Sequence, residues 1–249
     1  MALNNYLLQR VRKKDCLIAL LPCNGGSVIN PLKPGDVSPN SSDQGSWAER
    51  NGLITTENII IKDNVFTAAD PTKPAAIKTR LDMQQNSTAK TFIAQAVFHN
   101  LDSGPMRVSP LFNQGSYLMD SKFYVFNLNF RQIAATGYFN ISYALSNNTK
   151  ANTSYIVSGN FYDIPHTVAF VYDPIPDSGT ASIKFYLDTI LVNQRTIEHV
   201  PWNTLPPPYE AQTLGIREDF SAQYISDNQL AWAVIFDSAL SAEEIVLFK

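Results

Sequence analysis

The side chains best suited to acid–base chemistry in this chain are its glutamates and histidines. Glycoside hydrolysis needs two carboxylates beside the scissile bond, and acids at alternate positions of a strand, as in Glu-x-Asp, share one face. No such strand pattern occurs at Glu57, Glu198, Glu210, Glu218, Glu243 or Glu244. The three histidines, His99, His166 and His199, lie far apart, and no serine or cysteine motif accompanies them. We therefore predict no catalytic residues and no enzymatic activity.

Metal ligands are the next chemistry to consider. Calcium sites combine carboxylates with backbone oxygens, and five aspartates fall in predicted loops: Asp102, Asp163, Asp173, Asp177 and Asp219. No run of alternating Asp and Asn joins them, so we assign no metal ligand and keep calcium as an open alternative to no cofactor. Cys16 and Cys23 have no partners for a zinc site. They are interpreted as reduced thiols, with a disulfide across an intervening turn as the alternative.

Aromatic side chains in loops are the candidates for ligand binding. Trp202 and Tyr209 flank a proline-rich loop, and Trp47 lies in a loop rich in Ser and Gly. Exposed rings stack on the apolar faces of sugars. The alternative is that these rings anchor their loops against the domain. Trp232 lies inside a predicted core strand, so burial is expected for it.

The elements that position these residues are mostly strands. Residues 124–131 and 139–145 each alternate apolar and polar side chains, as half-buried strands do. Residues 135–137 (Ala-Thr-Gly) between them predict a hairpin connection and antiparallel pairing. The runs 167–172 and 230–236 are apolar on both faces, which is typical of central strands covered on both sides.

Helical signals are confined to the two ends of the chain. Ser241 and Glu244 form a capping box that begins a short C-terminal helix. Residues 4–14 have an apolar face and an opposing basic face, which indicates an amphipathic helix. We interpret residues 1–14 as an N-terminal arm that docks to a partner and whose removal leaves the domain folded.

Several segments resemble the laminin-G-like, concanavalin-A-like lectin and glucanase family, and in the right order. They are residues 15–25, 91–98, the segment His166-Thr167-Val168-Ala169-Phe170-Val171-Tyr172-Asp173, the segment 184–192, and the tail Ala239-Leu240-Ser241-Ala242-Glu243-Glu244-Ile245. Two positions depart from the family pattern: Thr189 replaces a turn glycine, and residues 95–97 (Gln-Ala-Val) replace a tryptophan. The resemblance implies an all-β, two-sheet antiparallel jelly-roll sandwich over residues 15–249.

Composition narrows the function classes. The net charge is −3 at pH 7 and the sequence pI is about 5.6, which argues against a nucleic-acid binder with a basic face. No apolar stretch reaches the ~20 residues of a membrane-spanning helix. The basic and apolar residues near the N-terminus lack the length and cleavage site of a signal peptide.

The functional hypothesis is a non-enzymatic bacteriophage virion protein, such as a capsid decoration, head-fibre, tail or baseplate component. It would bind neighbouring virion or surface proteins, with homo-oligomer formation and binding of a cell-surface glycan as further possibilities. The alternative is an extracellular, secreted carbohydrate-binding protein, and a glycan hydrolase is the third hypothesis. This step rests on fold analogy and the missing export signal.

Overall fold

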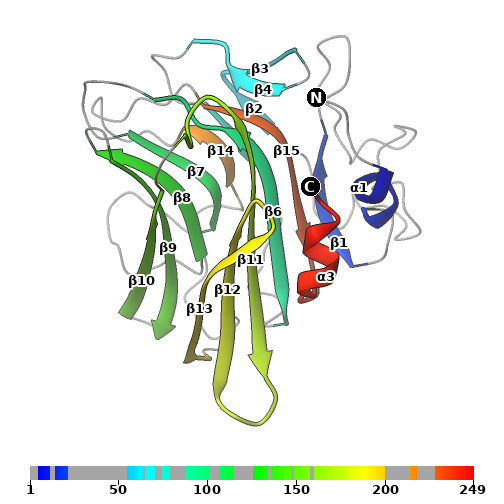
Figure 1. Cartoon of the computed structure of the whole chain (residues 1–249), viewed down its shortest axis with the longest axis vertical. Helices are drawn as coiled ribbons and strands as arrows, with labels where there is room; N and C mark the ends of the chain where they lie inside the picture. The colour runs from blue at the N-terminus through cyan, green and yellow to red at the C-terminus, as the bar shows by residue number, and fades with distance from the viewer. Residues whose placement is uncertain are drawn as a thin grey trace.

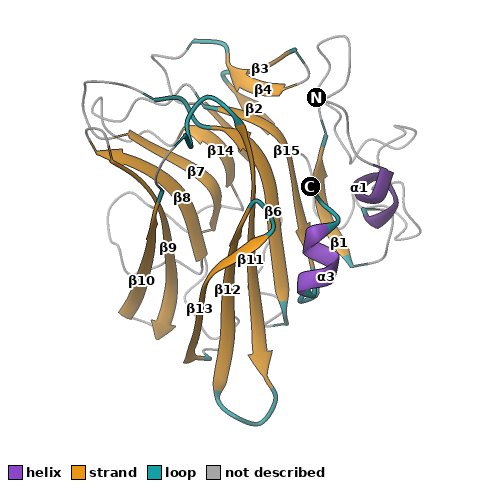
Figure 2. Ribbon diagram, viewed as in Figure 1, coloured by secondary structure: helices purple, strands orange, loops and turns teal. Residues whose placement is uncertain are grey.

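The computed structural model shows a sandwich of two β-sheets with the short helices α1 (Asn5–Arg10) and α3 (Ala242–Val246) on one side (Figure 1). The structure describes residues 5–11, 15–21, 55–63, 65–70, 75–78, 88–100, 107–114, 126–133, 136–146, 149–157, 160–199, 213–217 and 228–249. Strands make up most of this part of the chain (Figure 2). The predicted all-β, two-sheet antiparallel architecture is confirmed.

The first sheet has the strand order β13 (Ile190–Glu198), β12 (Thr180–Leu187), β11 (Pro165–Ile175), β6 (Lys90–Val97), β15 (Gln229–Phe236), β4 (Val65–Ala68) and β3 (Ile59–Lys62), and β1 (Cys16–Leu20) also pairs with β15. The second sheet has the order β10 (Thr149–Ile156), β9 (Thr136–Ser146), β8 (Phe126–Ile133), β7 (Arg107–Gln114), β14 (Thr213–Arg217), β5 (Ala75–Lys78) and β2 (Thr55–Glu57). Every pairing described is antiparallel.

The main core lies between the sheets and is rich in phenylalanine. Phe92 of β6 meets Phe112 of β7 with ring centroids 5.3 Å apart. Phe139 of β9 meets Phe185 of β12, also at 5.3 Å. Each pair joins one sheet to the other, and rings at this separation attract beyond the area that they bury. Side chains of one parity on each strand therefore fill the interior.

The central strands of the first sheet are buried on both faces, as their sequences predict. β6 lies between β11 and β15, and the opposite face of these strands contributes to a second apolar cluster with the helices. Trp232 belongs to this cluster and is 5% exposed. Strands without a polar side are stable only where both faces are covered.

The hairpin between β8 and β9 pairs as predicted, but its turn is shorter. Ile133 pairs with Thr136, so Thr136 and Gly137 belong to β9 and not to the connection. Gly137 is required for packing, because a Cβ there would lie 2.5 Å from the Tyr162 hydroxyl and 2.8 Å from Phe130 Cζ. The glycine that suggested a turn is a site of close approach.

The C-terminal helix α3 (Ala242–Val246) begins with the predicted capping box. The Glu244 N–H donates to Ser241 Oγ, and the Ser241 N–H donates to the Glu244 carboxylate. Ile245 and Phe248 are buried and Leu247 is exposed. Ile245 and Phe248 pack against the outer face of the first sheet as members of the second cluster.

The N-terminal helix α1 (Asn5–Arg10) packs beside α3 on the same sheet. Leu7 and Val11 are buried, and Tyr6 meets Phe248 edge to face at 5.1 Å. These contacts revise the interpretation of residues 1–14 as an arm for a partner, because the domain itself uses the apolar face of the helix. The domain boundary after residue 14 stays a prediction.

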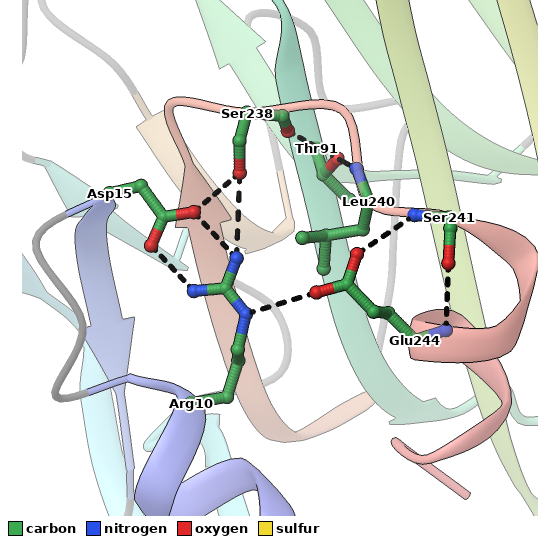
Figure 3. A network of polar contacts seen from close by, with 7 residues as sticks. All are labelled: Arg10, Asp15, Thr91, Ser238, Leu240, Ser241 and Glu244. Atoms are coloured by element: carbon green, nitrogen blue, oxygen red, sulfur yellow. Dashed lines mark hydrogen bonds and ion pairs between the residues drawn. The ribbon is translucent and has the colours of Figure 1, made fainter.

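A buried arginine, Arg10, holds the two helices against the first sheet (Figure 3). Arg10 is 4% exposed and donates from both Nη atoms to the Asp15 carboxylate, each at 2.5 Å. Its Nε lies 3.7 Å from Glu244, and the guanidinium lies 4.4 Å from the Phe236 ring centroid. Ser238 donates to the same Asp15 carboxylate. One cation therefore links α1, β1, β15 and α3.

The turn between β12 and β13 has a strained residue. Asp188 and Thr189 have φ of 50° and 69°, and they join Leu187 to Ile190 as a two-residue loop. Positive φ at both positions matches the type I′ turn of tight hairpins. Thr189 therefore lies where the family pattern has its turn glycine, and the turn still forms. The branched side chain of Thr189 disfavours this left-handed conformation.

We expect Arg10→Ala to lower the free energy of unfolding by about 3 kcal/mol, as loss of one partner of a buried ion pair does. Chemical denaturation measures the change. Arg195→Ala, at an exposed position of the edge strand β13, is the matched control. A loss no larger than that of the control would contradict the role of Arg10.

We expect Thr189→Gly to stabilise the protein by about 0.5–1 kcal/mol, because relief of the left-handed conformation outweighs the greater backbone entropy of glycine. Thr196→Gly, in the regular part of β13, should destabilise instead. Paired thermal melts measure both, and destabilisation by Thr189→Gly would contradict the strain.

Candidate functional site

The outer surface of the second sheet carries polar side chains where its inner surface carries core residues. On β8, Leu128 and Phe130 point into the core, so Asn129 and Arg131 lie on the opposite face because strand side chains alternate. The same alternation applies to β9 and β10. We call this surface the polar face, and it comprises Asn129, Arg131, Tyr138, Asn140, Ser142, Ser154 and Ile156.

Strand register arranges these residues in rows across the sheet. Arg131 pairs with Tyr138, and Tyr138 pairs with Ile156. In the next row, Asn129 pairs with Asn140, and Asn140 with Ser154. Neighbouring strands lie about 4.8 Å apart. Each row therefore places three side chains from three strands within reach of one small molecule.

Hydrogen bonds hold the amide side chains of the polar face in place. Arg131 Nε donates to Asn129 Oδ1 at 3.2 Å. Asn140 Nδ2 donates to Ser142 Oγ at 3.2 Å, and Ser154 Oγ donates to Asn140 Oδ1 at 3.2 Å. A carboxamide that is oriented by such bonds presents its remaining groups in a fixed direction.

Exposure changes along the polar face. Asn129, Asn140 and Ser142 are buried, whereas Arg131 and Tyr138 are half-buried. Ile156 is 65% exposed. The row of Arg131, Tyr138 and Ile156, together with the exposed Ser154, is therefore the accessible part of the polar face, and the buried amides beside it support its geometry.

The corresponding surface of the first sheet cannot serve the same purpose over its central strands. There, α1 and α3 cover β15 and its neighbours, as Figure 1 shows on the side away from β8–β10. Ala169, Val171 and Trp232 on that surface are buried among apolar side chains. The outer surface of the first sheet is thus covered by helices over its central strands, whereas the outer surface of the second sheet carries polar groups.

The polar face has no acidic residue of its own. Strands β8, β9 and β10 contain neither aspartate nor glutamate. A retaining or inverting glycosidase needs two carboxylates at the scissile bond, and these strands do not supply them. The polar residues that they do supply form hydrogen bonds with one another.

The three histidines lie in separate contacts. His99 Nδ1 lies 2.7 Å from Asp163 Oδ1, and the Tyr172 hydroxyl lies 2.6 Å from His199 Nδ1. His166 Nδ1 lies 2.7 Å from Asp188 Oδ2, and its Nε2 lies 2.7 Å from the Phe161 carbonyl oxygen. Each histidine thus has its own partner.

His166 is held as a cation, because both of its ring nitrogens face acceptors and each must donate. Burial disfavours the charged ring, but the bonds to Asp188 and to the Phe161 carbonyl outweigh it and raise the pKa of His166. Burial likewise opposes the charge of Asp188, yet the bonds from His166 and the Thr167 N–H lower its pKa. The pair ties β11 to the β12–β13 turn.

The structure describes some of the aspartates considered as metal ligands but none of the residues predicted to bind a ligand. Within the described ranges, no group of three or more His, Cys, Asp or Glu side chains is placed to hold a metal ion. Asp163, Asp173 and Asp177 are described, whereas Asp102 and Asp219 lie outside those ranges. The binding candidates Trp47, Trp202 and Tyr209 also lie outside the described residues, as does Cys23. Their roles stay predictions.

Sequence reasoning attended to loop aromatics and missed the polar face. The signal was present in the alternation of residues 127–131, whose polar members are Asn127, Asn129 and Arg131.

No helix in the described residues is both long and apolar enough to cross a membrane.

No protein-family model and no curated protein matches the chain. Solved structures do match. The binding domain of botulinum neurotoxin serotype D is similar with a TM-score of 0.59 and 12% identity, covering 94% of this chain and 51% of that one. The binding domain of botulinum neurotoxin DC, in complex with SialylT, has a TM-score of 0.58 and 9% identity, with coverage of 96% and 52%. A second structure of that domain contains rat synaptotagmin II.

The Trypanosoma rangeli sialidase in complex with sialic acid is also similar. Its TM-score is 0.53 and its identity 16%, with coverage of 78% of this chain and 29% of that one. This chain thus spans about half of the toxin domains and less than a third of the sialidase. At these identities the likeness shows the fold, a lectin-like β-sandwich, while membership of the laminin-G-like family stays a prediction.

We expect His166→Gln to destabilise the protein mainly between pH 4 and 6.5. The raised pKa of His166 gives stability that is full below its ordinary value of about 6.5 and is lost as the pH rises through the folded value. The lowered pKa of Asp188 gives stability that is present above about 3.9 and is lost as the pH falls through the folded value.

The expected loss at pH 5 is about 1 kcal/mol, less than the ~1.5–3 kcal/mol typical of a hydrogen bond to a charged group, because Asp188 is 43% exposed and solvent screens the pair. Urea denaturation of native and variant protein at pH 5 and pH 9 measures it. His99→Gln, at an exposed pair, is the control. An equal loss at both pH values would contradict a charged His166.

Proposed function

We propose that this protein is a glycan-binding module and that the ligand lies on the polar face of the second sheet. The observation that carries the proposal is the row of Arg131, Tyr138 and Ile156 beside a row of buried, hydrogen-bonded amides. Sugars present hydroxyl groups around an apolar ring face, and this surface offers groups that match both.

The amides and hydroxyls supply the polar half of this match. Asn129 and Asn140 each carry donors and an acceptor in one planar group, and their mutual contacts with Arg131 and Ser154 fix their orientation. A binding group that is already ordered loses less entropy when the ligand arrives. Placement on strands favours a rigid site.

Tyr138 supplies the apolar half. Its ring lies between Arg131 and Ile156 in the register and is half-buried, so its position is set while part of it remains accessible. Aromatic rings of this kind combine an apolar body with a polar tip. We place the sugar ring against Tyr138.

The structural comparisons support the proposal at the level of fold. The toxin domain named above was solved in complex with SialylT and the sialidase in complex with sialic acid, and this chain matches 52% and 29% of those two proteins. Fold alone does not carry function from one protein to another. The proposal of glycan binding therefore rests mainly on the chemistry of the polar face.

The kind of protein to which this glycan-binding module belongs stays a prediction. The module would serve a bacteriophage virion component that binds neighbouring subunits as well as glycan. It would equally serve a secreted lectin. A glycan hydrolase would need carboxylates from outside β8–β10, and release of reducing sugar from a bound glycan would reveal one. Light scattering on the full chain, with and without calcium, would separate an assembled subunit from a monomer.

We expect Tyr138→Ala to weaken glycan binding by about tenfold or more, since loss of a stacking ring removes roughly 1–1.5 kcal/mol beyond the area lost. An array of immobilised glycans identifies the ligand, and titration calorimetry on the best one measures the change. Ser178→Ala, in the exposed β11–β12 turn, is the control.

Unchanged binding by Tyr138→Ala, with melting equal to that of the native protein, would place the ligand elsewhere. The loop residues Trp47, Trp202 and Tyr209 would then be substituted next. Absence of binding to every glycan on the array would overturn the proposed function.

A further inference from the structure

We infer that the glycan recognised by the polar face is acidic, with a carboxylated sugar whose carboxylate binds Arg131 and whose apolar substituent lies on Ile156. This inference rests on the proposed function and names its ligand class. It draws on charge, on strand register and on exposure, which are separate observations.

The charge of strands β8, β9 and β10 is the first observation. These strands carry Arg131 and Lys150 and no acidic residue. The whole chain has a net charge of −3. By contrast, β11–β13 of the first sheet carry residues of both signs: the basic residues His166, Lys184 and Arg195, and the acidic residues Asp173 and Glu198. A surface of one sign favours ligands of the other.

The position of Arg131 is the second observation. Asn129, which is fully buried, accepts from Arg131 Nε at 3.2 Å. A guanidinium that is held through Nε keeps its plane fixed, and a planar guanidinium matches a carboxylate through two parallel hydrogen bonds. A tetrahedral sulfate ester can also accept two such bonds, but only a carboxylate can lie in one plane with the guanidinium, so we assign the carboxylate and not negative charge in general.

The third observation is the pair of neighbours beside Arg131. Tyr138 lies one strand away and Ile156 two strands away in the same row. Ile156 is 65% exposed and gives an apolar surface next to the ring. A sugar over Tyr138 would direct one substituent to each side: its carboxylate to Arg131 and an apolar group, such as the methyl of an N-acetyl substituent, to Ile156.

The experiment compares oligosaccharides that differ at one terminal group. Lactose, lactose with a terminal sialic acid, and lactose with a terminal sulfate are titrated into the whole 249-residue chain at low and at physiological salt. We expect the sialylated sugar to bind about tenfold or more tightly than either of the others, as a charge-assisted bidentate contact allows.

Three variants assign the effect to residues. Arg131→Ala should reduce binding of the sialylated sugar about tenfold to a hundredfold, and Arg131→Lys should recover only part of it because the planar fork is lost. Ile156→Ser should weaken binding by about threefold to tenfold. Matched controls are Arg195→Ala and Ile190→Ser on β13, where Ile190 is 67% exposed.

The outcomes separate this inference from the proposed function. Equal binding of lactose and its sialylated form, with loss in Tyr138→Ala, would overturn the acidic ligand and leave the glycan site in place. Equal binding of sulfated and sialylated forms would overturn the carboxylate. Sialyl-specific binding that survives Arg131→Ala with an unchanged melting curve would overturn the role of Arg131. No binding of these or any array glycan would overturn both.

Discussion

The structure depends on a strand group that is apolar on both faces. β11, β6 and β15 lie side by side at the centre of the first sheet and need a cover on each side. The second sheet covers one side through phenylalanine pairs such as Phe92 with Phe112. The helices α1 and α3 cover the other side through Leu7, Val11, Ile245 and Phe248. Because the interior of the sandwich already uses one face of the second sheet, its other face remains for polar chemistry.

The cover formed by the helices is held by electrostatics as well as by burial. Arg10 bonds Asp15 and stacks over Phe236, so a helix of only six residues, too short to be stable alone, is fixed to the sheet. Lys90, which is 1% exposed, pairs with Asp237 at the end of β15. These two buried cations secure neighbouring parts of one layer. The candidate site lies on the other sheet, and its rigidity comes from strand pairing.

Local patterns predicted local structure well. Alternation identified β8 and β9, two apolar runs identified β11 and β15, and Ser241 with Glu244 identified the start of α3. The predictions were wrong where the role of a residue depends on contacts with residues that are distant in the sequence. Gly137 serves close packing against Tyr162 and Phe130 and not a turn, and residues 5–11 pack on the domain as part of its second cluster.

The sequence by itself determined that Asn129 and Arg131 share one face of a strand, because side chains alternate with period two. It also determined that the central strands would be buried and that β8 and β9 would pair. Only the tertiary structure decided that Arg131, Tyr138 and Ile156 form one row, because strand register depends on turn lengths and on which face meets the core. It also decided which sheet would be covered by helices. That choice depends on contacts between residues at opposite ends of the chain, such as Tyr6 and Phe248, which no local pattern records.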